Sequence, residues 1–269
     1  MFYNAKNNNI KIGQADIDYI SFGNGTKNLI MIPGLGDGLK TVKGMAIPFA
    51  FMYKQFAKEY KIYVFSRRNK LTKGFTTKDM ANDIVAAMDL LNIPNADIIG
   101  VSQGGMIAQY IAINNPEKVK KLILVVTSSR PNEIINSVVG NWITLAEKED
   151  YKNIFIDTSE KSYSESYLKK YRKYYGIISK FAKPKDFQRF IIQANACIEH
   201  NVYDDLDKIK CPTLVIGGKQ DNIVGVNSSI EIAERIRKAE LYVYEDYGHG
   251  LYEEAKDFNN RVLSYFKEN

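Results

Sequence analysis

The chain has 269 residues, of which 45% are hydrophobic, and this apolar content suits one sizeable core in a single α/β domain with an insertion. The formal net charge is +6, but the lysines are scattered and no RNA- or DNA-binding motif accompanies them, so we expect no nucleic-acid partner. No apolar run could span a bilayer, residues 1–9 lack a signal-peptide core, and Cys197 and Cys211 are too few for a disulfide framework or a metal site, so we expect a cytoplasmic protein.

Apolar, strand-like segments alternate with helical patterns along the chain. Helical spacing is predicted over Lys78 to Leu91, Gln103 to Asn114, Asn227 to Arg237 and Tyr252 to Lys267. This alternation is typical of a mostly parallel sheet with helices on both faces. In such a sheet, the carboxyl ends of the strands meet at one edge, and ligands bind there.

Glycines crowd the loop that follows an early apolar strand. The strand is Leu29 to Ile32, and Pro33-Gly34-Leu35-Gly36-Asp37-Gly38 comes directly after it. Such a loop can bring a backbone N–H close to a ligand. A phosphate cradle is the alternative. However, no Gly-Lys-Ser/Thr follows, and no Gly-x-Gly-x-x-Gly opens a helix here, so nucleotide binding is disfavoured.

The segment from Ile98 to Tyr110 has the pattern of a buried strand, the motif Gly-x-Ser-x-Gly centred on Ser102, and an immediate helix. This context is typical of a nucleophile elbow, in which a serine sits on a sharp turn with its hydroxyl directed into a cleft. The helix behind it also presents free backbone N–H groups. The alternative for the bare motif is a tight turn with a surface serine. We predict that Ser102 is the nucleophile.

A long stretch between two predicted strands, residues 130–208, is mostly helical in pattern and too long for a loop. Tyrosines recur in it at helical spacing, at Tyr163, Tyr167, Tyr171 and Tyr174. One interpretation is a set of helices packed on the core. Another is a cap that excludes water and shapes an acyl pocket. Because basic residues lie between the tyrosines, contact with a membrane or nucleic acid is a third interpretation. The predicted pocket residues are Gly34, Met106, Trp142 and Val224.

A serine nucleophile needs a base, and the chain has two histidines. His249 follows a strand-like segment and comes after the best acid candidate, Asp221, which itself ends the run Pro212 to Asp221. His200 precedes that acid. Since nucleophile, acid and histidine follow one another in this order in one known architecture, we predict His249 as base and Asp221 as the residue that orients it. The weaker candidates for the acid are Asp246, which lies close to His249, and the solvent-facing Asp204, Asp205 and Asp207.

An oxyanion requires two hydrogen-bond donors close to the nucleophile. The backbone N–H of Leu35 lies in the glycine-rich loop, and that of Gln103 follows Ser102 directly. We predict that these two N–H groups form the oxyanion hole.

The succession of glycine loop, elbow, acid and histidine resembles the α/β-hydrolase superfamily over nearly the whole chain. The resemblance implies a core of residues 1–129 and 209–269, with a helical cap at 130–208. It also implies a triad of Ser102, Asp221 and His249 that works without a cofactor or metal ion. Two departures are visible. Pro33 stands where many members have histidine, and Ser66-Arg67-Arg68-Asn69 stands where many have aspartate, arginine and glycine.

The sequence therefore predicts a serine hydrolase that cleaves a carboxylic ester of small or medium apolar acyl type, with a small ester-like molecule as its partner. The same triad also serves aminopeptidases, thioesterases, acyltransferases and carbon–carbon bond hydrolases, and the fold includes non-catalytic ligand-binding proteins. An aminopeptidase needs carboxylates in its cap to bind a free amine. The available ones are Glu133, Glu147, Glu160 and Glu165.

Overall fold

The structure, a computed structural model, describes residues 3–268, and these form one eight-stranded sheet in the order β1-β2-β4-β3-β5-β6-β7-β8. The first two strands pair antiparallel, β2 runs antiparallel to β4, and the remaining pairs are parallel. The strands are β1 Lys6–Ile12, β2 Ala15–Phe22, β3 Lys27–Ile32, β4 Tyr60–Arg68, β5 Ala96–Val101, β6 Val119–Val125, β7 Thr213–Gly218 and β8 Ala239–Tyr244.

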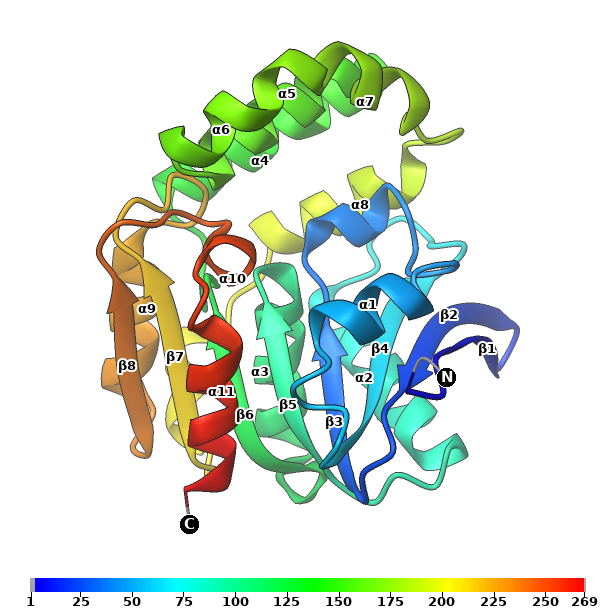
Figure 1. The fold of residues 1–269 in the computed structure, drawn as a ribbon, viewed down its shortest axis with the longest axis vertical. Helices are drawn as coiled ribbons and strands as arrows, with labels where there is room; N and C mark the ends of the chain where they lie inside the picture. The colour runs from blue at the N-terminus through cyan, green and yellow to red at the C-terminus, as the bar shows by residue number, and fades with distance from the viewer. Residues whose placement is uncertain (1–2, 269) are drawn as a thin grey trace.

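Helices cover both faces of the sheet (Figure 1). The covering helices are α1 Ala46–Met52, α2 Thr77–Leu90, α3 Gln103–Asn114, α9 Val226–Arg235, α10 Leu251–Glu254 and α11 Phe258–Lys267. Neighbouring strand residues point to opposite faces, so Ile98 packs in the core beneath α2, α3 and α9, whereas Ile99 packs in the core beneath α1 and α11. Because both faces are covered, the central strands are apolar at nearly every position. The predicted α/β fold class is confirmed.

The predicted helix from Tyr252 to Lys267 is wrong as a single element. The chain leaves the helical conformation at Ala255, which is extended, and resumes at Phe258. The break allows the Phe258 side chain to enter the core, where it is 2% exposed. The helix predicted to end at Arg237 ends at Arg235, since Ile236 is extended and buried.

Five α-helices and two 3-10 helices lie between β6 and β7 in the chain. The α-helices are α4 Glu133–Glu147, α5 Tyr151–Ser162, α6 Glu165–Tyr171, α7 Tyr175–Phe181 and α8 Gln188–Ile198, and the 3-10 helices are Arg172–Tyr174 and Tyr203–Lys208. Figure 1 shows α4 to α7 lying across the carboxyl-terminal edge of the sheet, with α8 nearer to it. An apolar cluster joins α4, α5 and α8 to Leu35 and Met106 of the core. No helix within residues 3–268 has the length and apolar character needed to cross a lipid bilayer.

Candidate active site

Ser102 lies at the junction of β5 and α3 in a strained backbone conformation, with φ 53° and ψ −120°. Its N–H donates to the carbonyl of Val125 over 2.9 Å, and the Thr127 hydroxyl donates to its carbonyl over 2.7 Å. These bonds hold the turn in place. The Ser102 side chain makes no capping bond to α3 and lines a cavity instead. Strain of this kind, fixed by its surroundings, is typical of functional sites.

The turn can form because glycines allow the backbones around it to touch. A Cβ atom on Gly104 would lie 1.9 Å from the carbonyl oxygen of Ile32, and one on Gly100 would lie 2.5 Å from the oxygen of Gly104. Neither distance is compatible with a side chain. The two glycines of the motif therefore place β3, β5 and α3 closely enough for Ser102 to project from the edge of the sheet.

His249 and Asp221 form a buried pair, in which His249 Nδ1 lies 2.8 Å from Asp221 Oδ2. The other carboxylate oxygen accepts the N–H groups of Ile223 and Val224 at 2.8 and 3.0 Å. Burial alone would raise the pKa of Asp221. The adjacent His249 and the backbone donors outweigh it and lower that pKa below its usual value. The carboxylate therefore stays ionised and can orient the imidazole.

Ser102 and His249 line the same cavity, whose volume is about 670 Å³. Within the described part of the chain, no hydrogen bond joins the Ser102 hydroxyl to His249. Such contacts are often long in unliganded sites and tighten when substrate binds.

The other candidates lie elsewhere. His200 is buried beneath α2, where its Nδ1 contacts the Thr77 hydroxyl at 3.0 Å and its ring packs edge-on against Tyr110. Asp246 is exposed. The three aspartates of the 203–208 turn lie outside the cavity.

Leu35 is the first residue of a 3-10 helix, Leu35–Gly38, and Gln103 is the first residue of α3. The backbone N–H of a first helical residue has no partner within its helix, which makes both N–H groups suitable donors. Gly34 brings the loop beside the nucleophile, since a Cβ on Gly34 would lie 3.3 Å from that of Ser102. Leu35 lines the cavity.

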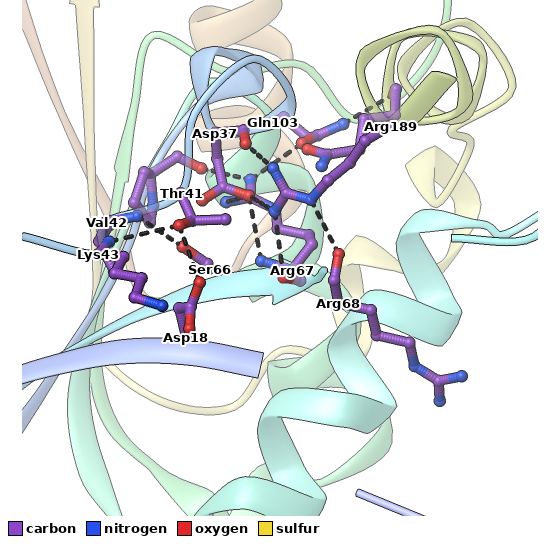
Figure 2. A network of polar contacts seen from close by, with 12 residues as sticks. Asp18, Asp37, Thr41, Val42, Lys43, Ser66, Arg67, Arg68, Gln103 and Arg189 are labelled. Carbon is purple, nitrogen blue, oxygen red and sulfur yellow. Dashed lines mark hydrogen bonds and ion pairs between the residues drawn. The ribbon is translucent and has the colours of Figure 1, made fainter. Parts of the chain in front are cut away.

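A buried polar network supports this loop and was missed in the sequence (Figure 2). The Arg67 guanidinium donates to Gln103 Oε1 over 2.9 Å and to the Pro33 carbonyl. The backbone N–H of Arg67 donates to Asp37 Oδ2 over 3.1 Å. Arg189 of α8 donates to both the carboxylate and the carbonyl of Asp37. Burial lowers the pKa of Arg67 to about 10, so its guanidinium remains charged at neutral pH. The only signal in the sequence was the unusual Ser66–Asn69 segment.

The cavity continues from Ser102 beneath α4, α5 and α6. Its lining includes all four residues predicted for the pocket: Gly34, Met106, Trp142 and Val224. The lining is mostly aliphatic and aromatic, and the tyrosine series contributes Tyr163, Tyr167 and Tyr171 to it.

None of the four carboxylates in residues 130–208 that were considered for amine binding lines the cavity. Glu160 and Glu165 instead pair with Arg172 away from the cavity, and Glu133 and Glu147 are exposed. Two carboxylates do line the cavity, Asp37, which Arg67 and Arg189 bind, and Glu253. Sequence reasoning missed Glu253 because it appeared to be one charge among many on a long surface helix.

A sequence model described as the alpha/beta hydrolase fold matches residues 27–256. The chain belongs to this family. Its match covers most of the chain, including the loop, the elbow, the insertion and the segment with His249. The resemblance seen in the sequence is confirmed.

Three relatives of this α/β-hydrolase are named as hydrolases of different substrates. A RutD protein of Caulobacter sp. (strain K31), named as a carbamate hydrolase, is 30% identical over 72% of this chain and 74% of its own. A 2-hydroxymuconate semialdehyde hydrolase of Pseudomonas sp. (strain CF600) is 30% identical over 68% of this chain and 66% of its own. A third relative, from Paraburkholderia xenovorans (strain LB400), is 24% identical over 94% of this chain and 91% of its own. It is named as a 2-hydroxy-6-oxononadienedioate/2-hydroxy-6-oxononatrienedioate hydrolase. All three are hydrolases, which supports a hydrolase activity here.

Solved structures agree on the fold. The metagenomic alpha/beta hydrolase MGS-M2 from the deep-sea Medee basin has a TM-score of 0.86 at 20% identity, over 97% of this chain and 98% of its own. The enol-lactonase of Burkholderia xenovorans LB400 has a TM-score of 0.83 at 17% identity, over 97% of this chain and 100% of its own.

Proposed function

We propose that this α/β-hydrolase is a serine hydrolase that cleaves carboxylic esters. Ser102 Oγ attacks the ester carbonyl as His249 Nε2 takes its proton, and Asp221 holds the imidazole through Nδ1. The oxyanion accepts hydrogen bonds from the N–H groups of Leu35 and Gln103. His249 then gives its proton to the departing alcohol, which leaves an acyl group on Ser102. A water molecule, deprotonated by His249, attacks that acyl group, and the imidazolium returns its proton to Ser102 Oγ as the acid leaves. These steps use the chain's own groups and water.

One observation carries the proposal. Ser102 and His249 line one cavity, and His249 Nδ1 lies 2.8 Å from the buried carboxylate of Asp221. The three residues follow three different strands of the sheet, β5, β7 and β8. A pure binding protein would gain nothing from holding an ionised carboxylate behind a histidine at such a site.

The cavity supports an apolar acyl group of small or medium size. Its volume of about 670 Å³ lies within the range of small-molecule sites. Relatives include hydrolases whose names specify dioate substrates, and a dioate carries two negative charges. The described residues that line this cavity include neither lysine nor arginine, so nothing there matches such a substrate.

A carbamate is the second candidate, because its carbonyl can be attacked by the same serine. The observation that favours it is the 30% identity to a relative named as a carbamate hydrolase. Ester and carbamate hydrolysis are distinguished by comparing para-nitrophenyl butyrate with para-nitrophenyl dimethylcarbamate as substrates.

The decisive test is the intact mass of the protein after exposure to a fluorophosphonate, together with its rate on para-nitrophenyl butyrate. We expect a single adduct and measurable turnover, both absent from Ser102→Ala, whose circular dichroism should match that of the parent. Retention of the adduct or of turnover in Ser102→Ala would remove the serine from its proposed role.

A further inference from the structure

Glu253 lines the cavity four residues after His249, on the short helix α10. Its Oε2 accepts a hydrogen bond from the Tyr163 hydroxyl at 2.7 Å. The Glu253 side chain is exposed, and it contributes to the lining of the cavity. Desolvation by nearby protein atoms, and then the neighbouring Glu254, raise the pKa of Glu253, and the tyrosine bond only partly offsets this. Its charge is therefore poorly compensated by the protein.

No cation of the protein supplies the missing compensation. Among residues 3–268, Glu253 takes part in no ion pair, and the described lining of the cavity contains neither lysine nor arginine. An exposed carboxylate at the edge of a largely apolar cavity, with no cationic partner from the protein, attracts a positive charge on a molecule that enters the cavity. The open position next to Glu253 lies within the cavity itself.

Several tyrosine rings line the same cavity as Glu253. The rings of Tyr163 and Tyr167 stack with centroids 4.4 Å apart, and Tyr171 continues the series at 4.5 Å from Tyr167. Tyr53 and Tyr252 line the same cavity from the core side. For both of them burial raises the pKa and the charge of Glu253 raises it further, which shows that the carboxylate lies near these rings as well. Faces of aromatic rings attract cations.

We propose that Glu253 and these tyrosines form a subsite for a positively charged alkylammonium group of the substrate. The carboxylate supplies the countercharge and the rings supply cation–π contacts to the N-methyl or N–H surface. This inference rests on the proposed hydrolase function and adds to it a substrate class: esters that carry an ammonium group at one end.

The alternative is a purely structural role for Glu253 in holding the cap. The neighbouring Glu254 already has such a role, because it accepts both the N–H and the hydroxyl of Ser164 at 3.0 and 2.5 Å. The Gly250 N–H adds a further bond to the Ser162 carbonyl at 2.7 Å. The cap is therefore tied to the loop after His249 without Glu253.

The test uses two matched substrate pairs. In one pair the charge is on the alcohol: choline butyrate against its neutral analogue, in which carbon replaces the quaternary nitrogen. In the other the charge is on the acyl chain: the para-nitrophenyl ester of γ-trimethylammonio butanoate against its carbon analogue. Values of kcat/KM are measured for the parent, for the isosteric Glu253→Gln, and for Glu245→Gln. Glu245 is an exposed residue outside the cavity, so its variant removes the same charge.

We expect the parent to prefer the cationic member of at least one pair about tenfold, mainly through a lower KM. Glu253→Gln should lose this preference and keep its rate on the neutral member, while Glu245→Gln behaves as the parent. Equal losses on both members would show a structural role and overturn the inference, as would a parent with no preference in either pair. Failure of the hydrolase proposal looks different: no ester is cleaved and a fluorophosphonate leaves Ser102 unlabelled.

Discussion

Arg67 donates a hydrogen bond to the side-chain oxygen of Gln103 over 2.9 Å, which ties the end of β4 to the first residue of α3. The Gln103 amide nitrogen in turn donates to the Gln193 carbonyl of α8 over 2.8 Å. The residue whose backbone N–H is proposed for the oxyanion hole is thus held from two sides through its side chain. Its position depends on the buried network as well as on the helix.

The first prediction concerns this support. Gln103→Ala keeps the backbone N–H but removes the three side-chain bonds, to Arg67, to the Gln193 carbonyl and to Cys197 Sγ, so the donor loses its fixed position. We expect kcat on para-nitrophenyl butyrate to fall about tenfold with little change in KM, because oxyanion donors act in the transition state. Gln188→Ala, on the exposed side of α8, is the control. A change confined to KM would contradict the role assigned to Gln103.

The second prediction separates Asp221 from Asp246, one of the weaker candidates for the acid. Asp221→Asn retains an oxygen for the Ile223 and Val224 N–H groups but no longer stabilises an imidazolium. We expect kcat/KM to fall by a factor of about 10⁴ with the fold preserved. Asp246→Asn, at an exposed position, should leave kcat/KM unchanged. The assignment fails if Asp246→Asn is the inactive variant.

The third prediction concerns His200 and acid stability. Burial lowers the pKa of His200 from 6.5 to about 3 in the folded protein. Between these pH values the unfolded chain binds one proton more than the folded one, so the free energy of unfolding decreases as the pH falls. The contribution reaches about 1.4 kcal/mol per pH unit.

Urea unfolding of the parent and of His200→Asn from pH 7 to pH 4 measures this contribution. The variant can still contact the Thr77 hydroxyl but does not titrate, so its stability should depend less steeply on pH. Parallel curves for the two proteins would show that His200 is not the group responsible.

The fourth prediction compares two helical glycines. An alanine at Gly104 would place its Cβ 1.9 Å from the Ile32 carbonyl oxygen, whereas a Cβ at Gly140 of α4 meets nothing within 4 Å. We expect Gly104→Ala to lower the free energy of unfolding by at least about 3 kcal/mol. Gly140→Ala should raise it by about 0.5–1 kcal/mol. Similar effects of both variants would contradict the close contact at the elbow.

The parts of the molecule that follow from local pattern could be predicted. The elbow around Ser102 is encoded within a few residues, because its glycines and apolar strand are contiguous. The relation between Asp221 and His249 spans 28 positions, but the parallel sheet brings their strand ends together. The fold class follows from the same alternation of strands and helices.

Long-range polar pairing could not be predicted. Arg67, Asp37 and Arg189 lie far apart in the chain, and nothing local to any of them indicates the others. The hydrogen bond between Tyr163 and Glu253 joins residues 90 positions apart, so nothing local to Glu253 indicates it. The strand Lys6–Ile12 is rich in asparagine and forms because β2 pairs with it in full register.

Arg189 belongs to the segment inserted between β6 and β7, yet its guanidinium neutralises Asp37 in the loop beside Ser102. Residues 130–208 therefore cannot be replaced without affecting the charge balance of the loop beside Ser102. An insertion grafted from another protein without an equivalent arginine would leave the buried carboxylate of Asp37 short of one partner. It would also loosen the loop that carries Leu35. Engineering of residues 130–208 in this chain must therefore retain Arg189 or alter Asp37 and Arg67 at the same time.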